Sequence, residues 1–279
     1  MIRLITSGFW TSIQDMGRFG HRKQGIPSSG AMDHYSAAMA NHLAGNAPTT
    51  PLIELTASGP KLVCEQACFM AVTAGFDLRI DGVLQGSGLK CYAPKGASIE
   101  FEPNGKGIRG YLAVRGGLKV PEVLGSYSQY QGITPAARLT KGDQLELAEP
   151  GQFAAARAFQ DLSVLSGSNL KVFPGPEWAR LDAYLQQAIL GATWQVGPES
   201  NRMAYVMGSM DGISGFDIVT APVQAGTVQL TPSGKLVVLM RDAQTTGGYA
   251  RILQLDDPSI DHLAQRFPGE GIGFELCKF

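Results

Sequence analysis

Five segments of the chain combine charged or amide side chains with glycine, a pattern suited to holding a small polar molecule. Two of them lie within the first 33 residues, and three lie beyond residue 198. They are Gln14-Asp15-Met16-Gly17-Arg18-Phe19-Gly20, Pro27-Ser28-Ser29-Gly30-Ala31-Met32-Asp33, Glu199-Ser200-Asn201-Arg202-Met203, Pro222-Val223-Gln224-Ala225-Gly226-Thr227-Val228-Gln229 and Arg241-Asp242-Ala243-Gln244-Thr245-Thr246-Gly247-Gly248-Tyr249.

The charged members of these segments indicate binding of an anion. Arg18 and Arg202 are candidates because a guanidinium binds a carboxylate or phosphate through two parallel hydrogen bonds. Asp15, Asp33 and Asp242 are candidate general bases, or they orient the arginines.

The uncharged members indicate recognition of an amide. The amide and hydroxyl groups of Gln244, Thr245 and Thr246 can form hydrogen bonds with a small amide or lactam. The pair Gly247-Gly248 lets the backbone approach a ligand closely. A helix expected from Ser29 offers free backbone N–H groups to an anion at its N-terminus. Each segment taken alone also fits a self-satisfied turn or bulged hairpin, so the functional interpretation depends on the five segments together.

Other motifs in the chain are coincidental. Residues 105–110 match G-x-G-x-x-G but run into an apolar strand instead of a helix, so we interpret them as a hairpin turn and not as a dinucleotide site. Two S-x-x-K matches, at residues 87–90 and 168–171, lie in turn-to-strand contexts, where a serine nucleophile is not expected. The four histidines and four cysteines have no ligand spacing, so we expect no metal site.

Composition restricts the protein class. The 279 residues carry 23 Lys plus Arg and 24 Asp plus Glu, a formal net charge of −1, which argues against nucleic-acid or membrane-surface partners. No apolar run has the length of a membrane span, and no signal peptide is recognisable at residues 1–7. The cysteines form no C-x-x-C pair, so we expect reduced thiols and a cytoplasmic protein.

The pattern of short strands and turns predicts a mainly β fold with a few short helices. Helices are expected over residues 29–45, 177–190 and 258–267, the last capped by Asp257, and Asp81-Gly82 predicts a hairpin. Strands are expected over residues 61–63, 69–72, 77–80, 98–101, 110–114, 144–147, 170–173, 227–230, 236–240 and 249–255. A change of composition after residue 149 suggests two domains, 1–165 and 166–279, with strand exchange between them left open.

The segments resemble the KipA-type proteins, also called the allophanate hydrolase subunit 2-like or biotin-dependent carboxyltransferase-like family. The resemblance rests on Gln14-Asp15-x-Gly17-Arg18-x-Gly20, Ser29-Gly30-x-x-Asp33, Ala40-Asn41-x-Leu43-x-Gly45-Asn46, Tyr111-Leu112-Ala113-x-x-Gly116-Gly117, Pro174-Gly175-Pro176, Ser200-Asn201-Arg202-Met203, Pro222-x-Gln224-x-Gly226-x-x-Gln229-Leu230 and Asp242-x-Gln244-Thr245-x-Gly247-Gly248-Tyr249. The matches follow the family's order along nearly the whole chain.

The resemblance implies two cyclophilin-like β-barrel units and a role as the C component of an ATP-dependent 5-oxoprolinase. That enzyme opens 5-oxo-L-proline to L-glutamate, with a KipI-like B component and a LamB/YcsF-like A component as partners and ATP bound with or through them. The implied catalytic residues are Asp15, Asp242, Gln244 and Thr245. The implied substrate-binding residues are Arg18, Ser29, Asp33, Asn201, Arg202, Gln224, Gly247, Gly248 and Tyr249.

Two alternatives remain open at this point. The first is a component of a biotin-dependent carboxyltransferase that acts on urea or a similar small amide. The chain has no biotinyl Met-Lys-Met sequence and so cannot carry covalently attached biotin. The second is a KipA-like regulator that binds a KipI-like kinase inhibitor.

Overall fold

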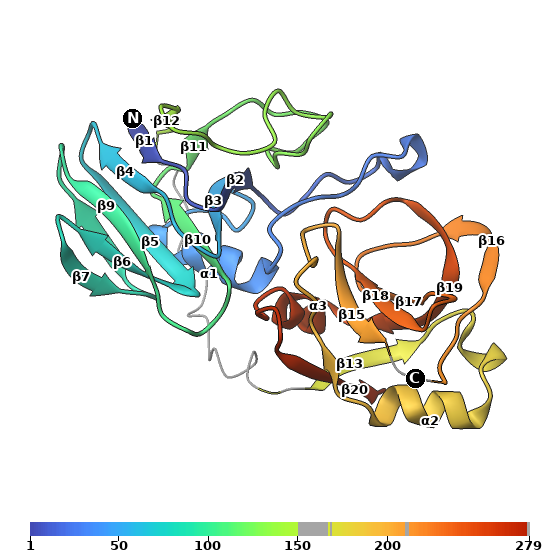
Figure 1. Cartoon of the computed structure of the whole chain (residues 1–279). Coiled ribbons are helices and arrows are strands. Elements are labelled where there is room, and N and C mark those ends of the chain that lie inside the picture. The colour runs from blue at the N-terminus through green and yellow to red at the C-terminus, as the bar shows by residue number, and fades with distance from the viewer. Residues whose placement is uncertain (150–166, 168, 210–211, 278–279) are drawn as a thin grey trace. The chain divides into compact units, whose positions relative to one another are not determined.

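The computed structural model describes residues 1–149, 167, 169–209 and 212–277, and its chain divides into two compact units (Figure 1). Unit 1 contains residues 1–19 together with the described residues from 29 to 149. Unit 2 contains residues 20–28 together with the described residues from 167 to 277. The expected boundary at 165/166 lies outside the described residues.

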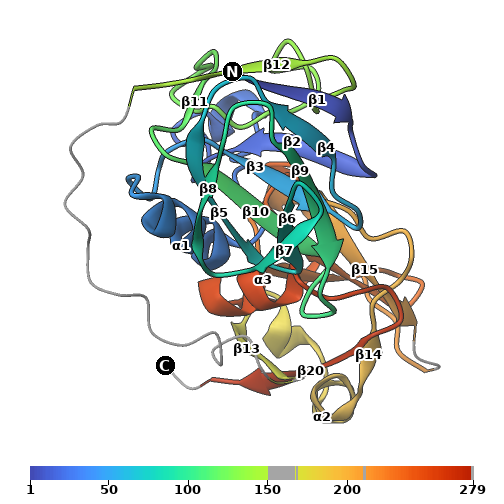
Figure 2. The ribbon, with the colours of Figure 1, turned by 90° about the vertical axis from the view of Figure 1, so that its left-hand side faces the viewer.

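Unit 1 is built from two antiparallel sheets. The seven-stranded sheet has the order β11-β12-β1-β4-β9-β6-β7, and the five-stranded sheet has the order β2-β3-β10-β5-β8. Figure 2 shows part of the five-stranded sheet, with β3, β10, β5 and β8 side by side. The strands are β1 Ile2–Thr6, β2 Trp10–Gln14, β3 Leu52–Thr56, β4 Lys61–Cys64, β5 Cys68–Ala74, β6 Phe76–Ile80, β7 Val83–Gly86, β8 Lys90–Ala93, β9 Ser98–Pro103, β10 Arg109–Val114, β11 Leu118–Lys119 and β12 Gln144–Leu147.

The core of unit 1 follows from strand alternation. Leu112 of β10 belongs to a large apolar cluster shared by both sheets, whereas its neighbours Tyr111 and Ala113 join a second cluster with alanines of α1 (His34–Ala44). Successive side chains of a strand point to opposite faces, so one buried strand serves both clusters. The five-stranded sheet therefore has the other sheet on one face and α1 on its opposite face.

Unit 2 contains one eight-stranded sheet in the order β14-β20-β13-β19-β17-β18-β15, with β16 paired to β19. Its two ends approach each other, because Val196 bridges Met207 and the Gly197 N–H donates to the Val206 carbonyl at 2.7 Å. The sheet is therefore a nearly closed barrel. Its strands are β13 Asn169–Pro174, β14 Trp194–Gln195, β15 Ala204–Ser209, β16 Asp217–Pro222, β17 Thr227–Leu230, β18 Lys235–Leu239, β19 Thr246–Leu255 and β20 Gly271–Leu276.

The mainly β prediction is confirmed, and every predicted strand overlaps an observed one. The Asp81-Gly82 hairpin is also confirmed, since Ile80 pairs with Val83 across it. Residues 105–110 are not a hairpin, because β9 and β10 belong to different sheets; the segment is a turn between sheets.

The helix boundaries differ from the predicted ones. Helix α1 begins at His34 and not near Ser29, the second prediction divides into a 3₁₀ turn η3 (Trp178–Arg180) and α2 (Ala183–Gly191), and α3 is Asp257–Leu263. Asp33, Asp182 and Asp256 cap the three α-helices by accepting the N–H three residues later. Asp257 is therefore the first residue of α3, not its cap.

Candidate functional site

Unit 2 brings three of the predicted segments together. The Asp242 N–H donates to the Arg202 carbonyl at 3.0 Å, and the Val223 N–H donates to the Thr245 carbonyl at 3.1 Å. Ala204 also pairs with Leu239 where β15 begins and β18 ends. The turns around residues 202, 223 and 243 therefore lie side by side at strand ends of the barrel.

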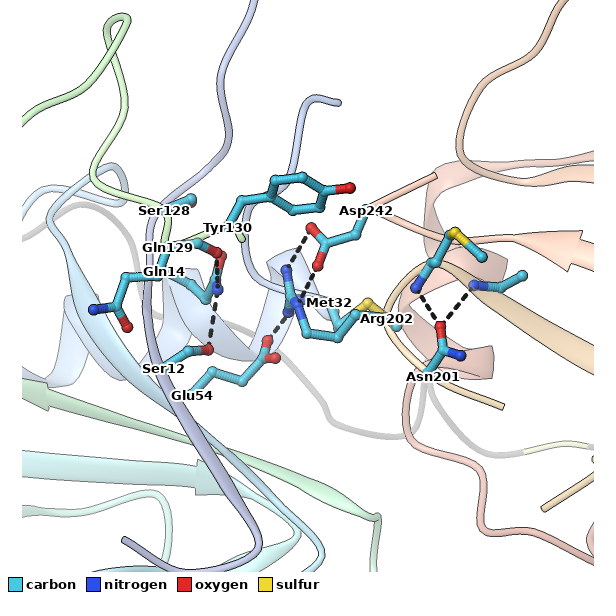
Figure 3. Close-up of polar contacts among 12 residues, drawn as sticks. Ser12, Gln14, Met32, Glu54, Ser128, Gln129, Tyr130, Asn201, Arg202 and Asp242 are labelled. Carbon is cyan, nitrogen blue, oxygen red and sulfur yellow. Dashed lines mark hydrogen bonds and ion pairs between the residues drawn. The ribbon is translucent and has the colours of Figure 1, made fainter. Parts of the chain in front are cut away.

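A two-point ion pair joins two of these turns (Figure 3). Arg202 donates from Nε to Asp242 Oδ2 at 2.8 Å and from Nη2 to Asp242 Oδ1 at 3.1 Å. Both side chains are about nine-tenths buried, at 10% and 11% exposure. A two-point contact of this kind fixes the orientation of the guanidinium plane. The sequence allowed two roles for Asp242, general base or orienting group, and this contact supports the orienting role.

Asn201 holds the turn that presents Arg202. Its Oδ1 accepts the Met203 N–H at 2.8 Å and the Ala204 N–H at 3.3 Å (Figure 3). Its Nδ2 donates to the Glu199 carbonyl at 3.2 Å. These hydrogen bonds give Asn201 a role in positioning the neighbouring arginine, and its predicted contact with substrate stays a prediction.

The remaining polar side chains of these turns reach solvent. Gln224 and Gln244 are exposed, Thr245 is half-buried, and Tyr249 at the start of β19 is 44% exposed. These groups are accessible to a ligand. Gln244 and Thr245 lie on the Asp242 turn, Gln224 lies on the neighbouring turn around Val223, and Tyr249 lies on β19.

The two adjacent glycines have different surroundings. A Cβ on Gly247 would lie 2.7 Å from Nε2 of the buried Gln229, whereas the nearest atom to a Cβ on Gly248 would be the Ile218 carbonyl oxygen at 3.7 Å. A side chain at Gly247 would therefore displace the amide of the buried Gln229, which gives this glycine a packing role inside unit 2.

Strand β19 also links the Pro174-Gly175-Pro176 motif to this region. Arg251 forms a two-point pair with Glu177, at 3.0 and 2.9 Å, and donates from Nη1 to the Pro222 carbonyl at 2.9 Å. The hydrogen bonds and charge of Arg251 lower the pKa of Glu177 below its usual range. A Cβ on Gly175 would lie 2.2 Å from the Arg251 carbonyl oxygen, so glycine is needed there.

Arg22 is a further cation that the sequence analysis missed. It lies in η1 (Arg22–Gln24), within the 20–28 segment of unit 2, and its guanidinium donates to the Val223 carbonyl. Arg22 is partly exposed, and its partner Val223 directly precedes Gln224 in the chain. No sequence signal marks it, because it falls between two motif segments.

In unit 1, Asp15 organises a loop. Its carboxylate accepts hydrogen bonds from the Gly17 N–H, the Tyr127 N–H and the hydroxyls of Ser126 and Ser128, at 2.8, 2.7, 2.8 and 2.5 Å respectively. The side chain is 7% exposed. This arrangement supports the orienting interpretation of Asp15 over that of a general base.

Arg18 is buried within the same loop, so its predicted role as a ligand-binding cation is not supported. It has no solvent exposure, and it donates to the Val123 carbonyl from Nε and to the Ser128 carbonyl from Nη2, both at 2.9 Å. Its guanidinium is used to hold residues 123–128 against the Arg18 turn.

The predicted anion site at a helix N-terminus near Ser29 is wrong. Ser29 and Gly30 have φ values of 55° and 96°, a left-handed backbone that cannot continue into a helix. The helix begins only after Asp33, which has no solvent exposure and whose carboxylate accepts the Ser36 N–H and hydroxyl at 2.8 and 2.6 Å. The Asp33 carboxylate therefore caps α1 at the helix end where a bound anion was expected.

Buried polar groups fasten the Met32–Asp33 turn to the five-stranded sheet. Glu54 of β3 accepts the Met32 N–H at 2.7 Å (Figure 3), and the Tyr111 hydroxyl of β10 accepts the Asp33 N–H at 2.8 Å. Burial, followed by the charges of Glu54 and Asp33, raises the pKa of Tyr111 well above its usual value. A single glutamate in the apolar run Leu52-Ile53-Glu54-Leu55 was the sequence signal for this contact.

Two features are absent from the described residues. No group of three or more His, Cys, Asp or Glu side chains among them has metal-binding geometry. In the same residues, no helix has both the length and the apolar character needed to cross a membrane. The expected meeting of the unit 1 and unit 2 segments in one cleft stays a prediction.

Comparisons with known proteins assign this chain, whose unit 2 is a nearly closed β barrel, to a family. The family model "Carboxyltransferase domain, subdomain A and B" matches residues 24–276. The chain belongs to this family.

Named relatives fall into two groups. The chain is 33% identical to the C subunit of 5-oxoprolinase from Escherichia coli, over 100% of this chain and 92% of that protein. It is also 39% identical to urea amidolyase of Saccharomyces cerevisiae over 134 residues, which are 46% of this chain and 7% of that protein.

Solved structures share the fold. The crystal structure of TTHA0988 has a TM-score of 0.89 at 30% identity over 98% of this chain, and this chain spans 55% of that one. The K. lactis urea amidolyase has a TM-score of 0.87 at 25% identity, with 99% of this chain and 19% of that chain covered. This chain thus corresponds to part of these two longer proteins.

Proposed function

We propose that this chain is the C component of a cytoplasmic, ATP-dependent 5-oxoprolinase, which opens 5-oxo-L-proline to L-glutamate. The observation that carries the proposal is the set of unit 2 turns joined by backbone hydrogen bonds at residues 202, 223 and 242. These turns carry Arg202, Gln224 and Gln244, and Arg22 contacts them through the Val223 carbonyl. The end-to-end similarity to the corresponding 5-oxoprolinase protein of Escherichia coli supports it.

The substrate is a small ring that carries one carboxylate and one amide. In this proposal Arg202 and Arg22 bind the carboxylate or a phosphate, since each is a guanidinium group in contact with one of the unit 2 turns. Gln224, Gln244 and Thr245 bind the ring amide, and Tyr249 borders the site.

Asp242 has a double role in the proposal. In the free protein it holds the Arg202 guanidinium through two hydrogen bonds. A substrate carboxylate that binds Arg202 competes with Asp242 for the same N–H groups, and a released Asp242 carboxylate is then able to accept a proton from the reacting amide. Asn201 keeps Arg202 in place during this exchange.

The other components supply what this chain does not. We propose a KipI-like B component and a LamB/YcsF-like A component as partners, with ATP bound with or through them. The sequence contains no G-x-x-x-x-G-K-[ST] loop, which agrees with an ATP site shared with another protein of the complex.

The test is reconstitution with the products of the neighbouring reading frames, followed by measurement of 5-oxoproline-dependent ADP and glutamate release. We expect Asp242→Asn to lower kcat at least ~100-fold, the usual scale for loss of an acid–base group. Gln244→Ala should raise KM about 10-fold, as expected for a lost substrate hydrogen bond. Gln195→Ala, an exposed glutamine on β14, is the matched control and should leave the kinetics unchanged.

Full activity of both site variants, with unfolding midpoints like the wild type, would overturn these roles. An inactive complex in every combination of components would overturn the proposed function itself.

Carboxyl transfer to urea or a similar small amide is a second candidate, favoured by the family model and by the urea amidolyase relatives. It predicts that the chain, supplied with a carboxybiotin carrier and urea, releases free biotin from carboxybiotin, with no dependence on 5-oxoproline. Only one of the two substrates should support turnover.

A further inference from the structure

Two cysteines lie side by side where the sheets of unit 1 meet. Strand β4 ends at Cys64 and strand β5 begins at Cys68, and their Sγ atoms are 3.9 Å apart. Both are free thiols, with 0% and 9% exposure. Nothing in the proposed reaction uses them.

The backbone around this pair is fixed on both sides. Cys64 pairs with Ile2 of β1 and its N–H donates to the Ala97 carbonyl at 3.0 Å, while Cys68 pairs with Ala93 of β8. Because β4 and β5 belong to different sheets, the three residues between the cysteines form the connection. A disulfide bond is about 2.05 Å long, so its formation requires the two sulfurs to approach each other by roughly 2 Å.

Cys68 also borders a cavity of about 210 Å³, whose other lining residues include Gln66, Arg115 and Glu149. A water molecule takes up about 30 Å³ in the liquid, so the cavity has room for a peroxide.

The two thiols differ in acidity. The hydrogen bond between the two sulfurs, in which either can be the donor, lowers the pKa of Cys68 in spite of its burial. The same hydrogen bond, together with burial, raises the pKa of Cys64. Cys68 therefore has the character of the attacking thiolate and Cys64 that of the resolving thiol.

We propose that Cys64 and Cys68 form a peroxide-reactive dithiol site that closes to a reversible disulfide. The Cys68 thiolate attacks one oxygen of hydrogen peroxide, the O–O bond breaks, and the departing hydroxide takes a proton, giving a sulfenic acid and water. The Cys64 sulfur then attacks the Cys68 sulfur, the S–S bond forms, and the sulfenic oxygen leaves as a second water with the Cys64 proton. Two electrons pass from the two thiols to one peroxide.

The experiment treats the full chain with one equivalent of hydrogen peroxide and maps its tryptic peptides by mass. Both cysteines lie in the peptide 62–79, whereas Cys91 lies in the peptide 91–95. We expect the first peptide to lose 2 Da, and dithiothreitol to restore it. This loss should be at least ~10-fold faster than oxidation of Cys91, since burial raises the pKa of Cys91.

Variants separate the two steps. Cys64→Ser should stop at a sulfenic acid that dimedone traps on Cys68, Cys68→Ser should give neither product in this peptide, and Cys91→Ser should behave as wild type. Oxidation of Cys91 or Cys277 while both thiols of peptide 62–79 stay free to alkylation would overturn the proposal. The wild-type map is decisive even if a serine variant fails to fold.

Discussion

In unit 1, the charged residues of the predicted segments are almost completely withdrawn from solvent, with Asp15 at 7% exposure and Arg18 and Asp33 at 0%. In unit 2, the buried Arg202–Asp242 pair has exposed neighbours, Gln224 and Gln244. Similar residue types therefore serve two purposes. The first group holds loops of its own unit together, and the second group leaves side chains accessible to a ligand.

The strongest test of this contrast is Asp15→Ala. The change leaves four donors in a buried loop without their acceptor, so we expect a loss of about 3 kcal/mol in the free energy of unfolding, measured by urea denaturation. Gln244→Ala, in the exposed group, should change the same quantity by less than ~0.5 kcal/mol. Equal losses for the two variants would contradict the distinction between the units.

A buried titratable side chain in unit 2 provides a test of how burial affects the stability of that unit. Burial and the nearby Arg266 lower the pKa of His262 to about 4, below its usual 6.5, so between these values the unfolded chain binds more protons. Stability should therefore fall as the pH drops from 6.5 toward 4, by about 2 kcal/mol at pH 5.

The control for this prediction is His262→Gln, which removes the titration. Urea unfolding at pH 7 and pH 5 should show that the variant loses about 2 kcal/mol less than the wild type. An identical pH dependence for both proteins would show that His262 is not the group responsible.

The Arg202–Asp242 pair provides a further test of the comparison between the units, because it is buried although its neighbours in unit 2 are exposed. A double-mutant cycle with Arg202→Gln and Asp242→Asn should give a coupling energy of about 1–2 kcal/mol in unfolding experiments. A coupling near zero would mean that the two-point contact does not persist in solution.

The smallest expected difference in stability is the one between the alanine variants of Gly247 and Gly248. Gly247→Ala places a methyl group 2.7 Å from Gln229 Nε2 and should cost about 1 kcal/mol, whereas Gly248→Ala meets nothing closer than 3.7 Å and should cost less than ~0.5 kcal/mol. Thermal unfolding of both variants measures the difference. If Gly248→Ala is the more damaging change, the packing explanation for Gly247 is wrong.

The strands were predictable from sequence because short runs such as residues 227–230 and 236–240 are rich in β-branched and apolar residues and are bounded by turns. The start of α1 was not, since Ser28, Ser29 and Asp33 are all good caps by type, and only the left-handed backbone at Ser29 and Gly30 excludes the first two. Helix starts depend on φ angles that residue type does not determine.

For the candidate site, sequence identified which polar turns matter in unit 2 more readily than it identified which of their side chains are buried. The turns at Arg202, Gln224 and Asp242 were identified from their polar residues, but Arg18 and Arg202 looked equivalent in sequence and are not. Whether a guanidinium meets a carboxylate, a carbonyl or solvent depends on residues more than 100 positions away, such as Ser128 for Arg18. Arg22 was missed for the same reason.

The pairing of β13 with β20 affects how the protein is made. These strands are parallel partners, with Leu170 opposite Phe274, and β20 is also the strand on which β14 pairs. The barrel cannot close until the ribosome has synthesised β20. Residues 20–28 belong to unit 2 and cannot take their final positions before then. Because long-range pairing slows folding, unit 1 should complete its own sandwich first during synthesis.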